Sequence, residues 1–272
     1  MKKIIDCIKS NMRQIIEIVV LAIVIFIPRC VNLSDIFKDY LENNPLSPDN
    51  IPWYIAISYG SHIASLILFF AVLIAIRKCN SDFVMNRKFV YHDYCYAWYW
   101  LCSKILGVKK CDLVLVPIFM QFKLVIRSTF DDFPLNEDEY PVVDNEPESR
   151  VTEWNMDNAG NEINLILEDT YIIEKTQLPV SKRNLRTIKI SRNAGNGRHF
   201  SQKFIETTMN VVRKLDETSI VNLYTTTNPM NTKHIAKRVF ALGGRGNIAH
   251  LYVFQQGQDE KRTFQSKAYK VY

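Results

Sequence analysis

The chain has 272 residues, of which 47% are hydrophobic and 23% charged, and its formal net charge is +6. This length allows one medium-sized domain and a smaller unit, and nine glycines and ten prolines exclude a collagen-like or low-complexity chain. The hydrophobic content also excludes a chain that is disordered throughout. Apolar residues gather in the first third and charged residues in the remainder, which predicts a membrane part followed by a soluble part.

Two apolar segments in the first third predict membrane-spanning helices. Residues 51–76 contain no Asp, Glu, Lys or Arg, and this run exceeds the about 20 apolar residues that a helix needs to cross a bilayer. Residues 12–33 form a second span if the arginines near its ends reach the headgroups. No small-x-small cleavage site follows this segment, so we expect a retained helix and not a signal peptide. The sequence thus predicts a two-helix transmembrane hairpin within residues 1–88.

The charges that flank the spans predict their orientation. Lysines and arginines precede the first span and follow the second, whereas residues 28–50 between them carry four acidic and two basic residues. By the positive-inside rule, both termini lie in the cytoplasm. We therefore expect a multi-pass membrane protein whose C-terminal domain is cytoplasmic.

Two polar residues fall inside the predicted hydrophobic zone. Ionisable groups in a membrane are candidates for function. Glu17 follows Arg13 by one helical turn, which favours an ion pair in the headgroup layer. His62 stands among small residues that let helices approach closely, so it is the better candidate for a pore or a helix contact, with simple packing as the alternative.

Three segments follow the hairpin before the last module. Residues 89–106 are dense in Tyr and Trp, which indicates a helix that lies at the membrane surface or, alternatively, in the core of the soluble domain. Residues 112–129 are rich in Val, Ile, Leu and Phe and predict two strands, so that residues 89–130 hold an aromatic juxtamembrane helix and the first strands. Residues 131–162 have a net charge of −10 and predict an acidic, flexible loop.

Residues 163–272 form a basic module with a net charge of +10 and a regular order of elements. Apolar runs and helical spacing alternate along it. This alternation predicts a parallel sheet with crossover helices, that is, a cytoplasmic Rossmann-like α/β domain. The predicted strands are residues 163–167, 171–174, 186–191, 220–224 and 249–254, and the predicted helices are residues 201–215 and 231–242.

Two loops of this module follow strands at the sheet edge where open parallel sheets bind ligands. The loop 192–199 is basic and glycine-containing and leads into a helix, an arrangement that suits phosphate. The loop 225–228 offers hydroxyl and amide groups before the second helix. Neither GxGxxG nor GK[ST] is present, so simple connections are the alternative. The candidate ligand-binding residues are Arg192, Asn196, Arg198, Thr225, Thr226, Thr227, Asn228 and Lys233.

No catalytic or metal-binding residue is assigned. His199 and His234 could act with a nearby carboxylate, but no nucleophile elbow accompanies them, which favours solvent-exposed histidines. The six cysteines form neither a CxxC pair nor a Cys–His spacing typical of metal ligands. We expect no cofactor and no metal, and the sequence favours a non-enzyme while leaving an enzyme open as the alternative.

The layout of two spans (residues 12–33 and 51–76) and a soluble α/β part resembles the two-transmembrane effectors of bacterial antiphage defence systems. These include effectors encoded beside retrons or nucleotide second-messenger synthases. The resemblance implies a cytoplasmic sensing domain coupled to a membrane hairpin that damages the inner membrane and so kills or arrests the infected cell.

Three functions are consistent with these features. The leading hypothesis is a sensor–effector, in which a nucleotide, a nucleic acid or a controlling protein partner acts on the α/β module and the spans assemble into a leak. Two spans cannot enclose a pore alone, so this hypothesis predicts a homo-oligomer in the lipid bilayer. The alternatives are a membrane-tethered enzyme acting on a phosphorylated or nucleotide substrate, and a non-enzymatic membrane scaffold.

Overall fold

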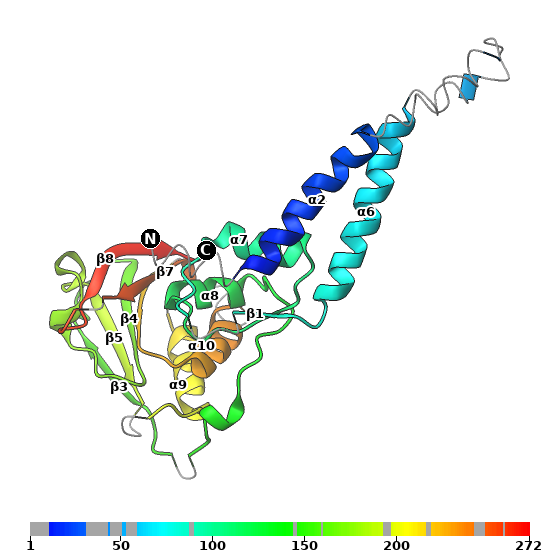
Figure 1. The fold of residues 1–272 in the computed structure, drawn as a ribbon. Coiled ribbons are helices and arrows are strands. Elements are labelled where there is room, and N and C mark those ends of the chain that lie inside the picture. The colour runs from blue at the N-terminus through cyan, green and yellow to red at the C-terminus, as the bar shows by residue number, and fades with distance from the viewer. Residues whose placement is uncertain are drawn as a thin grey trace. The chain divides into compact units, whose positions relative to one another are not determined.

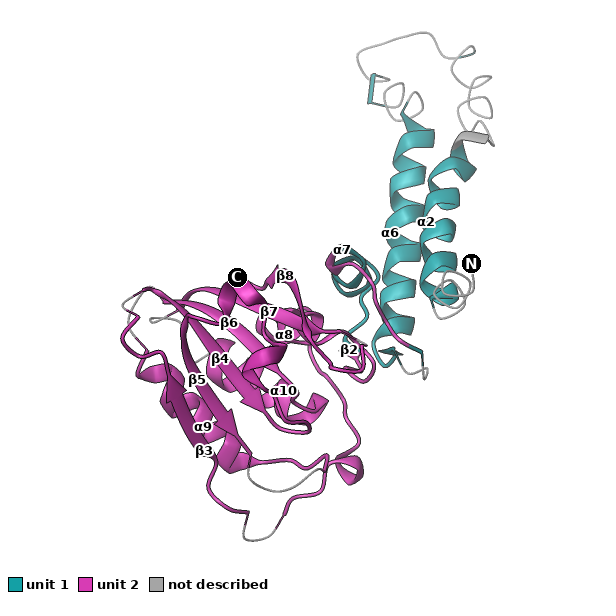
Figure 2. Ribbon diagram, turned by 90° about the vertical axis from the view of Figure 1, so that its left-hand side faces the viewer, with its two compact units in different colours: residues 1–90, 97–110 teal, residues 91–96, 111–272 magenta. Residues whose placement is uncertain are grey.

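The chain divides into two compact units (Figure 2). We call residues 1–90 and 97–110 the helical unit, and residues 91–96 and 111–272 the sheet unit. Figure 1 shows the order of the elements along the chain. The computed structural model describes residues 11–30, 43, 51–52, 59–86, 90–143, 146–158, 160–192, 197–215, 219–241, 248–257 and 259–272.

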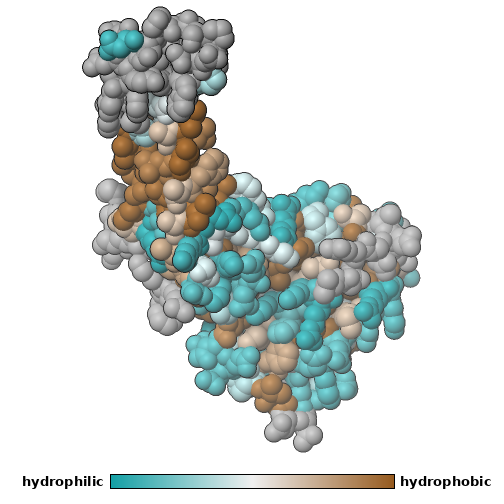
Figure 3. All heavy atoms as spheres, turned by 90° about the vertical axis from the view of Figure 1, so that its right-hand side faces the viewer, coloured by the Kyte–Doolittle hydropathy of each residue, from teal (hydrophilic) through white to brown (hydrophobic). Residues whose placement is uncertain are grey.

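The helical unit is built around two long helices, α2 (Met12–Cys30) and α6 (Gly60–Asn80), which lie side by side (Figure 1). Many of their apolar side chains are exposed, and Phe26 on α2 and Ile67 on α6 are 58% and 65% exposed. Hydrophobic residues cover the surface of this helix pair (Figure 3). A helix pair with so much exposed apolar surface is typical of a lipid-facing element and not of a soluble core.

One helix among the described residues, α6, is long and apolar enough to cross a membrane by length and composition. Helix α2 has a similar length but carries Arg13, Glu17 and Arg29. A second membrane span therefore stays a prediction. Parts of both predicted spans, residues 31–33 and 53–58, lie outside the described residues.

Residues 97–106 of the aromatic segment lie against the base of α6 within the helical unit. The segment forms α7 (Tyr96–Trp100) and the π-helical turn η1 (Leu101–Ile105). Asn80, which is fully buried, donates hydrogen bonds to Glu17 Oε2 at 2.8 Å and to the carbonyl of Leu106 at 3.0 Å. The guanidinium of Arg77 donates to the carbonyl of Lys104 at 2.7 Å. These contacts join both long helices to the segment that follows them.

The sheet unit contains a six-stranded sheet in the order β3-β5-β4-β6-β7-β8. Its four central strands are parallel, and β3 and β8 are antiparallel to their neighbours. The central strands are apolar runs because both faces of the sheet are covered. The strands are β3 (Arg150–Trp154), β4 (Glu162–Glu168), β5 (Arg186–Ser191), β6 (Ser219–Thr225), β7 (Ile248–Gln256) and β8 (Phe264–Lys270).

Helices cover one face of this sheet. Helix α8 (Ile118–Ile126) packs on β7, and α9 (Gln202–Arg213) packs on β5. Between them lies α10 (Pro229–Ile235), which continues as the π-helical segment η5 (Ala236–Ala241). The side-chain oxygens of Ser201 and Asn228 accept hydrogen bonds from the backbone nitrogens of Phe204 and Asn231 and so cap the first turns of α9 and α10.

The connection from β4 to β5 forms a second apolar cluster with the sheet. It contains the short 3₁₀ turns η3 (Lys175–Gln177) and η4 (Val180–Lys182). Its side chains Ile173 and Leu178 pack with residues of β4, β6, β7 and β8. The sheet residues of this cluster are Ile166, Tyr224, Phe254 and Phe264. The remaining short elements are β1 (Val84–Met85), β2 (Lys110–Cys111) and the 3₁₀ turn η2 (Glu137–Glu139).

The expectation of a mixed α/β fold with a sheet is confirmed, but three local predictions need correction. Both strands predicted within residues 112–129 are wrong: residues 112–117 form a turn, and helix α8 begins at Ile118 and buries Met120, Phe122 and Leu124. A short apolar run cannot be told from a buried helix by periodicity alone. Residues 171–174 belong to the β4–β5 connection and not to a strand, whereas β3 lies within the acidic segment predicted mainly as a loop.

Candidate functional site

The order of the strands places a topological switch point between β4 and β6. From β4 the chain continues to β5 on one side, and it then returns to β6 on the other side of β4. In open parallel sheets, ligands bind outside the carboxyl ends of the strands at such a point. Asp169 and Thr170 follow β4, and Thr226 and Thr227 follow β6, so these residues meet at the switch point.

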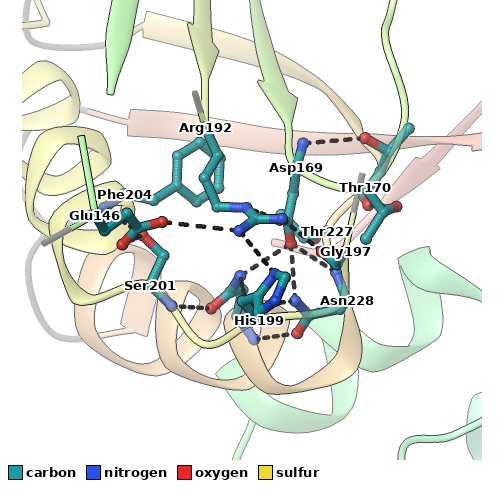
Figure 4. Close-up of polar contacts among 12 residues, drawn as sticks. Glu146, Asp169, Thr170, Arg192, Gly197, His199, Ser201, Phe204, Thr227 and Asn228 are labelled. Atoms are coloured by element: carbon teal, nitrogen blue, oxygen red, sulfur yellow. Dashed lines mark hydrogen bonds and ion pairs between the residues drawn. The ribbon is translucent and has the colours of Figure 1, made fainter. Parts of the chain in front are cut away.

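A buried ion pair lies at this edge of the sheet (Figure 4). Arg192 Nε donates to Asp169 Oδ1 at 2.5 Å, and the two side chains are 1% and 0% exposed. Asp169 Oδ2 accepts hydrogen bonds from the backbone and side-chain nitrogens of Asn228 and from the side chain of Asn231, at 2.9–3.0 Å. Burial raises the pKa of the Asp169 carboxyl, and these hydrogen bonds and the guanidinium oppose the rise.

The same network also holds the described residues at the two ends of the loop 192–199. Arg192 also donates to the carbonyl of Gly197, and its Nη1 lies 3.8 Å from Glu146 Oε1. The amides of Asn228 and Asn231 donate to the carbonyl of His199 at 2.9 and 3.0 Å. The structure thus places Arg192 and Asn228 inside the protein, where a ligand would have to replace these contacts to reach them.

A cavity of about 220 Å³ opens beside this network, and we call it the threonine cavity. Its wall is formed by the ends of β4, β6 and β7 together with the beginning of α8 and Tyr91. The residues from the strand ends are Thr170, Tyr171, Thr225, Thr226, Thr227, Gln255 and Gln256. Those from the other side include Tyr91, Ile118 and Gln121.

The threonine cavity offers uncharged polar groups and aromatic rings. Gln121 Oε1 and Gln256 Nε2 are buried and have no hydrogen-bond partner among the described residues. Tyr91 and Tyr171 are 48% and 49% exposed, and the guanidinium of Arg262 lies 3.9 Å from the centre of the Tyr171 ring. A free acceptor, a free donor and exposed rings are the groups that recognise a nucleobase or a similar planar heterocycle.

Thr226 holds one wall of this cavity in place. Its Oγ1 accepts a hydrogen bond from the backbone nitrogen of Asp169 at 3.2 Å and donates to the carbonyl of Tyr171 at 2.9 Å. The hydroxyls of Thr225 and Thr227 bond to each other at 2.8 Å. The three threonines predicted from sequence are therefore brought together, and each has an internal partner.

The other predicted ligand residues are not brought into the threonine cavity. Arg198 is exposed, and Asn196 lies outside the described residues. Lys233 donates to the carbonyl of Phe133 at 2.7 Å and lies 3.8 Å from Asp132 Oδ1. Sequence reasoning missed Tyr91, Gln121 and Gln256 because they come from segments far from the predicted loops. A glutamine at the end of a buried strand is the one signal that could have pointed to the site.

The two polar residues of the predicted spans have defined surroundings in the helical unit. Glu17 pairs with Arg13 at 3.0 Å, as their spacing predicted. His62 lines a cavity of about 290 Å³ together with Ile25, Ser65, Leu66 and Phe69. Beside it, Ser65 Oγ donates to the carbonyl of Ser61 at 2.8 Å, so this hydroxyl is satisfied within its own helix.

The described part of the chain contains no group of three or more His, Cys, Asp or Glu residues that could hold a metal ion. His199 Nδ1 lies 3.4 Å from Arg192 Nη1. Burial and the neighbouring cations Arg238, Lys233 and Lys237 lower the pKa of His234 to about 4. The imidazole of His234 is therefore neutral at physiological pH.

Fold and site define a mixed α/β protein with a polar cavity at the carboxyl ends of its parallel strands and a helix pair that exposes apolar side chains. The family described as SMODS- and ubiquitin system-associated 2TM effector domain (SUa-2TM) matches residues 1–272, and the chain belongs to this family. It is thus a two-transmembrane effector domain of antiphage defence systems, as the resemblance predicted. Membership in this family indicates membrane association.

Two solved structures of an Acinetobacter baumannii Cap4 receptor with a SAVED/CARF domain are similar to this chain. The structure with the cyclic trinucleotide 3′3′3′-cAAA shares 8% identity and a TM-score of 0.47, over 88% of this chain and 65% of that chain. The structure with 2′3′3′-cAAA shares 9% identity and a TM-score of 0.44, over 64% and 41%. The chain thus spans less than two thirds of either receptor. None of the curated proteins compared with the chain matches it.

Proposed function

We propose that this chain is a membrane-anchored sensor–effector of antiphage defence. Its sheet unit binds a nucleotide signal in the threonine cavity, and helices α2 and α6 cross the bacterial inner membrane and assemble into a leak. The observation that carries the proposal is the position of this cavity at the switch point of the parallel strands, where its lining residues Gln121 and Gln256 have an amide oxygen and an amide nitrogen without a partner in the described part of the chain.

The chemistry of the threonine cavity supports a nucleobase as the part of the signal that enters it. A base edge carries both donors and acceptors, which would satisfy Gln256 Nε2 and Gln121 Oε1, and each bond gained at a buried group is worth about 1 kcal/mol. The base faces can stack on Tyr91 and Tyr171. The cavity is small, so the phosphates lie outside it, over a module whose net charge of +10 attracts them. In this proposal the sheet unit is a Rossmann-like sensing domain.

The helix pair supports a membrane anchor with two spans. Helix α6 is long and apolar enough to cross a bilayer. Helix α2 also exposes apolar side chains, among them Ile16, Ile23 and Phe26. Lysines and arginines precede the first span and follow the second, so by the positive-inside rule both termini lie in the cytoplasm. The Arg13–Glu17 pair at the base of α2 then lies at the cytoplasmic headgroup layer.

The effector step requires several copies of the chain, because one helix pair cannot enclose a pore. Gly60 and Ser61 are small, partly exposed residues beside His62, and small residues allow close contact between membrane helices. A cavity lined by His62 and Phe69 lies beside these residues, and a side chain of a neighbouring copy would fit into it. Binding of the signal to the sheet unit then favours the assembled state.

The experiment is dye release from liposomes that contain the purified full chain. Mononucleotides, cyclic dinucleotides and cyclic trinucleotides are added one by one, and binding is measured in parallel by calorimetry. We expect at least one nucleotide to bind and to accelerate release, and Gln256→Leu to weaken both. The matched control is Gln202→Leu, which changes an exposed glutamine of α9 outside the cavity. The proposal is wrong if no nucleotide binds, or if nucleotide binding leaves dye release unchanged.

A further inference from the structure

A second cavity lies in the sheet unit, and we call it the Tyr140 cavity. Its volume is about 350 Å³, within the range of small-molecule sites. It shares no lining residue with the threonine cavity. Residues of the acidic segment, Phe200 shortly before α9, and helix α10 form it. The residues that matter here are Glu137, Tyr140, Pro141, Phe200, Met230 and His234.

The wall of the Tyr140 cavity is built by segments that are tied together. The backbone nitrogen of Phe200 donates to the carbonyl of Pro141 at 3.2 Å, and Val142 forms a parallel bridge with Phe200. The preceding residue, His199, accepts hydrogen bonds from Asn228 and Asn231 at its carbonyl. The cavity is thus an organised feature of the fold, anchored to the same polar network that borders the threonine cavity.

Aromatic rings dominate this wall. The rings of Phe200 and His234 lie 4.9 Å apart between centroids, at 58° to each other. Tyr140 also lines the cavity but is 2% exposed, so the open ring faces are those of Phe200 and His234. Rings in such a cluster present flat apolar faces, which suit a planar ligand better than an aliphatic one.

The hydroxyl of Tyr140 has no hydrogen-bond partner among the described residues, although it is buried. A buried polar group without a partner is unfavourable, and in native proteins a missing water, ion or ligand is a common reason for it. Burial raises the pKa of Tyr140 to about 12, so this hydroxyl stays protonated and can donate. His234, which is neutral, adds one donor and one acceptor.

We propose that the Tyr140 cavity is a second ligand site, which binds an uncharged planar heterocycle that accepts a hydrogen bond from the Tyr140 hydroxyl and packs on Phe200 and His234. The carboxylate of Glu137 at the rim disfavours an anionic ring but accepts from an amino group. A purine or pyrimidine base meets these conditions. The exposed Arg198 interacts electrostatically with Tyr140 and gives a counter-charge for a phosphate attached to such a base.

The test uses the purified full chain in lipid nanodiscs and four probes: adenosine, guanosine, cytidine and uridine. Affinity is measured by calorimetry and contact by saturation-transfer NMR. We expect at least one nucleoside to bind, and Tyr140→Phe to weaken its affinity about ten-fold, because this change removes only the donor. Phe200→Leu removes the stacking surface and should weaken binding further. Gln202→Leu, outside both cavities, should leave affinity unchanged.

Thermal unfolding without ligand separates binding from folding. Tyr140→Phe deletes an unpaired buried hydroxyl, so its melting temperature should equal or exceed that of the unmodified chain. A clear decrease would show that the hydroxyl is already satisfied, and would overturn the proposal. The same follows if no nucleoside binds, or if Gln256→Leu weakens binding while Tyr140→Phe does not, because the base then occupies the threonine cavity. The function proposed above would survive this last result.

Discussion

Asp169 and Arg192 form an ion pair that is shielded from water on both sides, with side chains 0% and 1% exposed. The pair joins the residue that follows β4 to the residue that follows β5. It therefore holds the carboxyl ends of two neighbouring parallel strands together, at the edge where the threonine cavity opens. The energetic consequence is asymmetric: the intact pair adds modest stability, whereas breaking it leaves a charge buried alone.

Replacing Arg192 with Met should therefore destabilise the sheet unit strongly. The Asp169 carboxylate would keep its hydrogen bonds from Asn228 and Asn231 but lose its counter-charge, and we expect a loss of about 3–5 kcal/mol. Chemical unfolding followed by tryptophan fluorescence measures this. Glu148→Gln, which removes an exposed partner of Lys203, should cost less than about 1 kcal/mol. Equal effects of the two changes would contradict the structural role assigned to the buried pair.

Thr226→Val should loosen the wall of the threonine cavity. The change preserves the shape of the side chain but leaves the nitrogen of Asp169 and the carbonyl of Tyr171 without their partner. We expect a loss of about 1–3 kcal/mol in the free energy of unfolding. Thr226→Ser retains the hydroxyl and should lose less. Comparable losses in the two variants would show that the methyl group, and not the hydroxyl, is important at this position.

His234 should make the folded protein less stable as the pH falls. In the unfolded chain the imidazole takes up a proton near its ordinary pKa of 6.5, whereas in the fold it does so only near 4. Between these values the unfolded chain binds more protons, so the free energy of unfolding decreases with decreasing pH. From pH 7 to 5 we expect the unmodified chain to lose on the order of 1 kcal/mol more than His234→Gln. Parallel pH profiles of the two proteins would rule out this depressed pKa.

Asn80→Ala should release the aromatic segment from the base of the long helices. The change removes the donor to Glu17 and to the carbonyl of Leu106. We expect amides of residues 101–106 to exchange at least about ten-fold faster with deuterated water, since one lost buried hydrogen bond costs about 1–3 kcal/mol. Ser81→Ala removes only an exposed local bond to Lys78 and should leave this exchange unchanged. Protection that survives Asn80→Ala would mean that Arg77 alone holds the segment.

Gly107→Ala should also weaken this junction. Gly107 has a φ of +74°, and a Cβ atom there would lie 2.8 Å from Cγ of Arg77. Both the left-handed backbone and the close approach oppose a side chain, so we expect a loss of about 1–3 kcal/mol. At Gly60 a Cβ would meet nothing within 4 Å, and Gly60→Ala should be neutral or slightly stabilising. Thermal unfolding of the full chain in detergent compares the two.

The elements of the sheet unit could be predicted where burial leaves a local pattern. The predicted strand 186–191 coincides with β5, and helix α9 lies within the predicted residues 201–215. Central parallel strands read as continuous apolar runs because both their faces are covered, and α9 alternates between a core and a solvent face. Helix α8 was predicted as a strand because it is apolar on nearly all sides. Its sequence is therefore a continuous apolar run, like that of a buried strand, without the periodic polar face that marks a helix.

The candidate site was predictable only in part. Thr225, Thr226 and Thr227 were found because they follow a strand at the edge where ligands bind. Gln121 and Gln256, which line the same cavity, are more than 100 residues apart in the sequence, so no local spacing could have connected them.

The sequence by itself determined that the chain has an apolar first third with a bilayer-length segment, followed by a basic module that alternates strands and helices. Composition and periodicity are local properties, so they can be determined from the sequence without knowledge of the fold. Only the tertiary structure decided that Arg192 pairs with Asp169 inside the protein, and that the hydroxyl of Tyr140 is buried with no partner among the residues that the structure describes. Pairing and burial depend on contacts between distant segments, because the free energy of a polar group is set by what surrounds it and not by its neighbours in the chain.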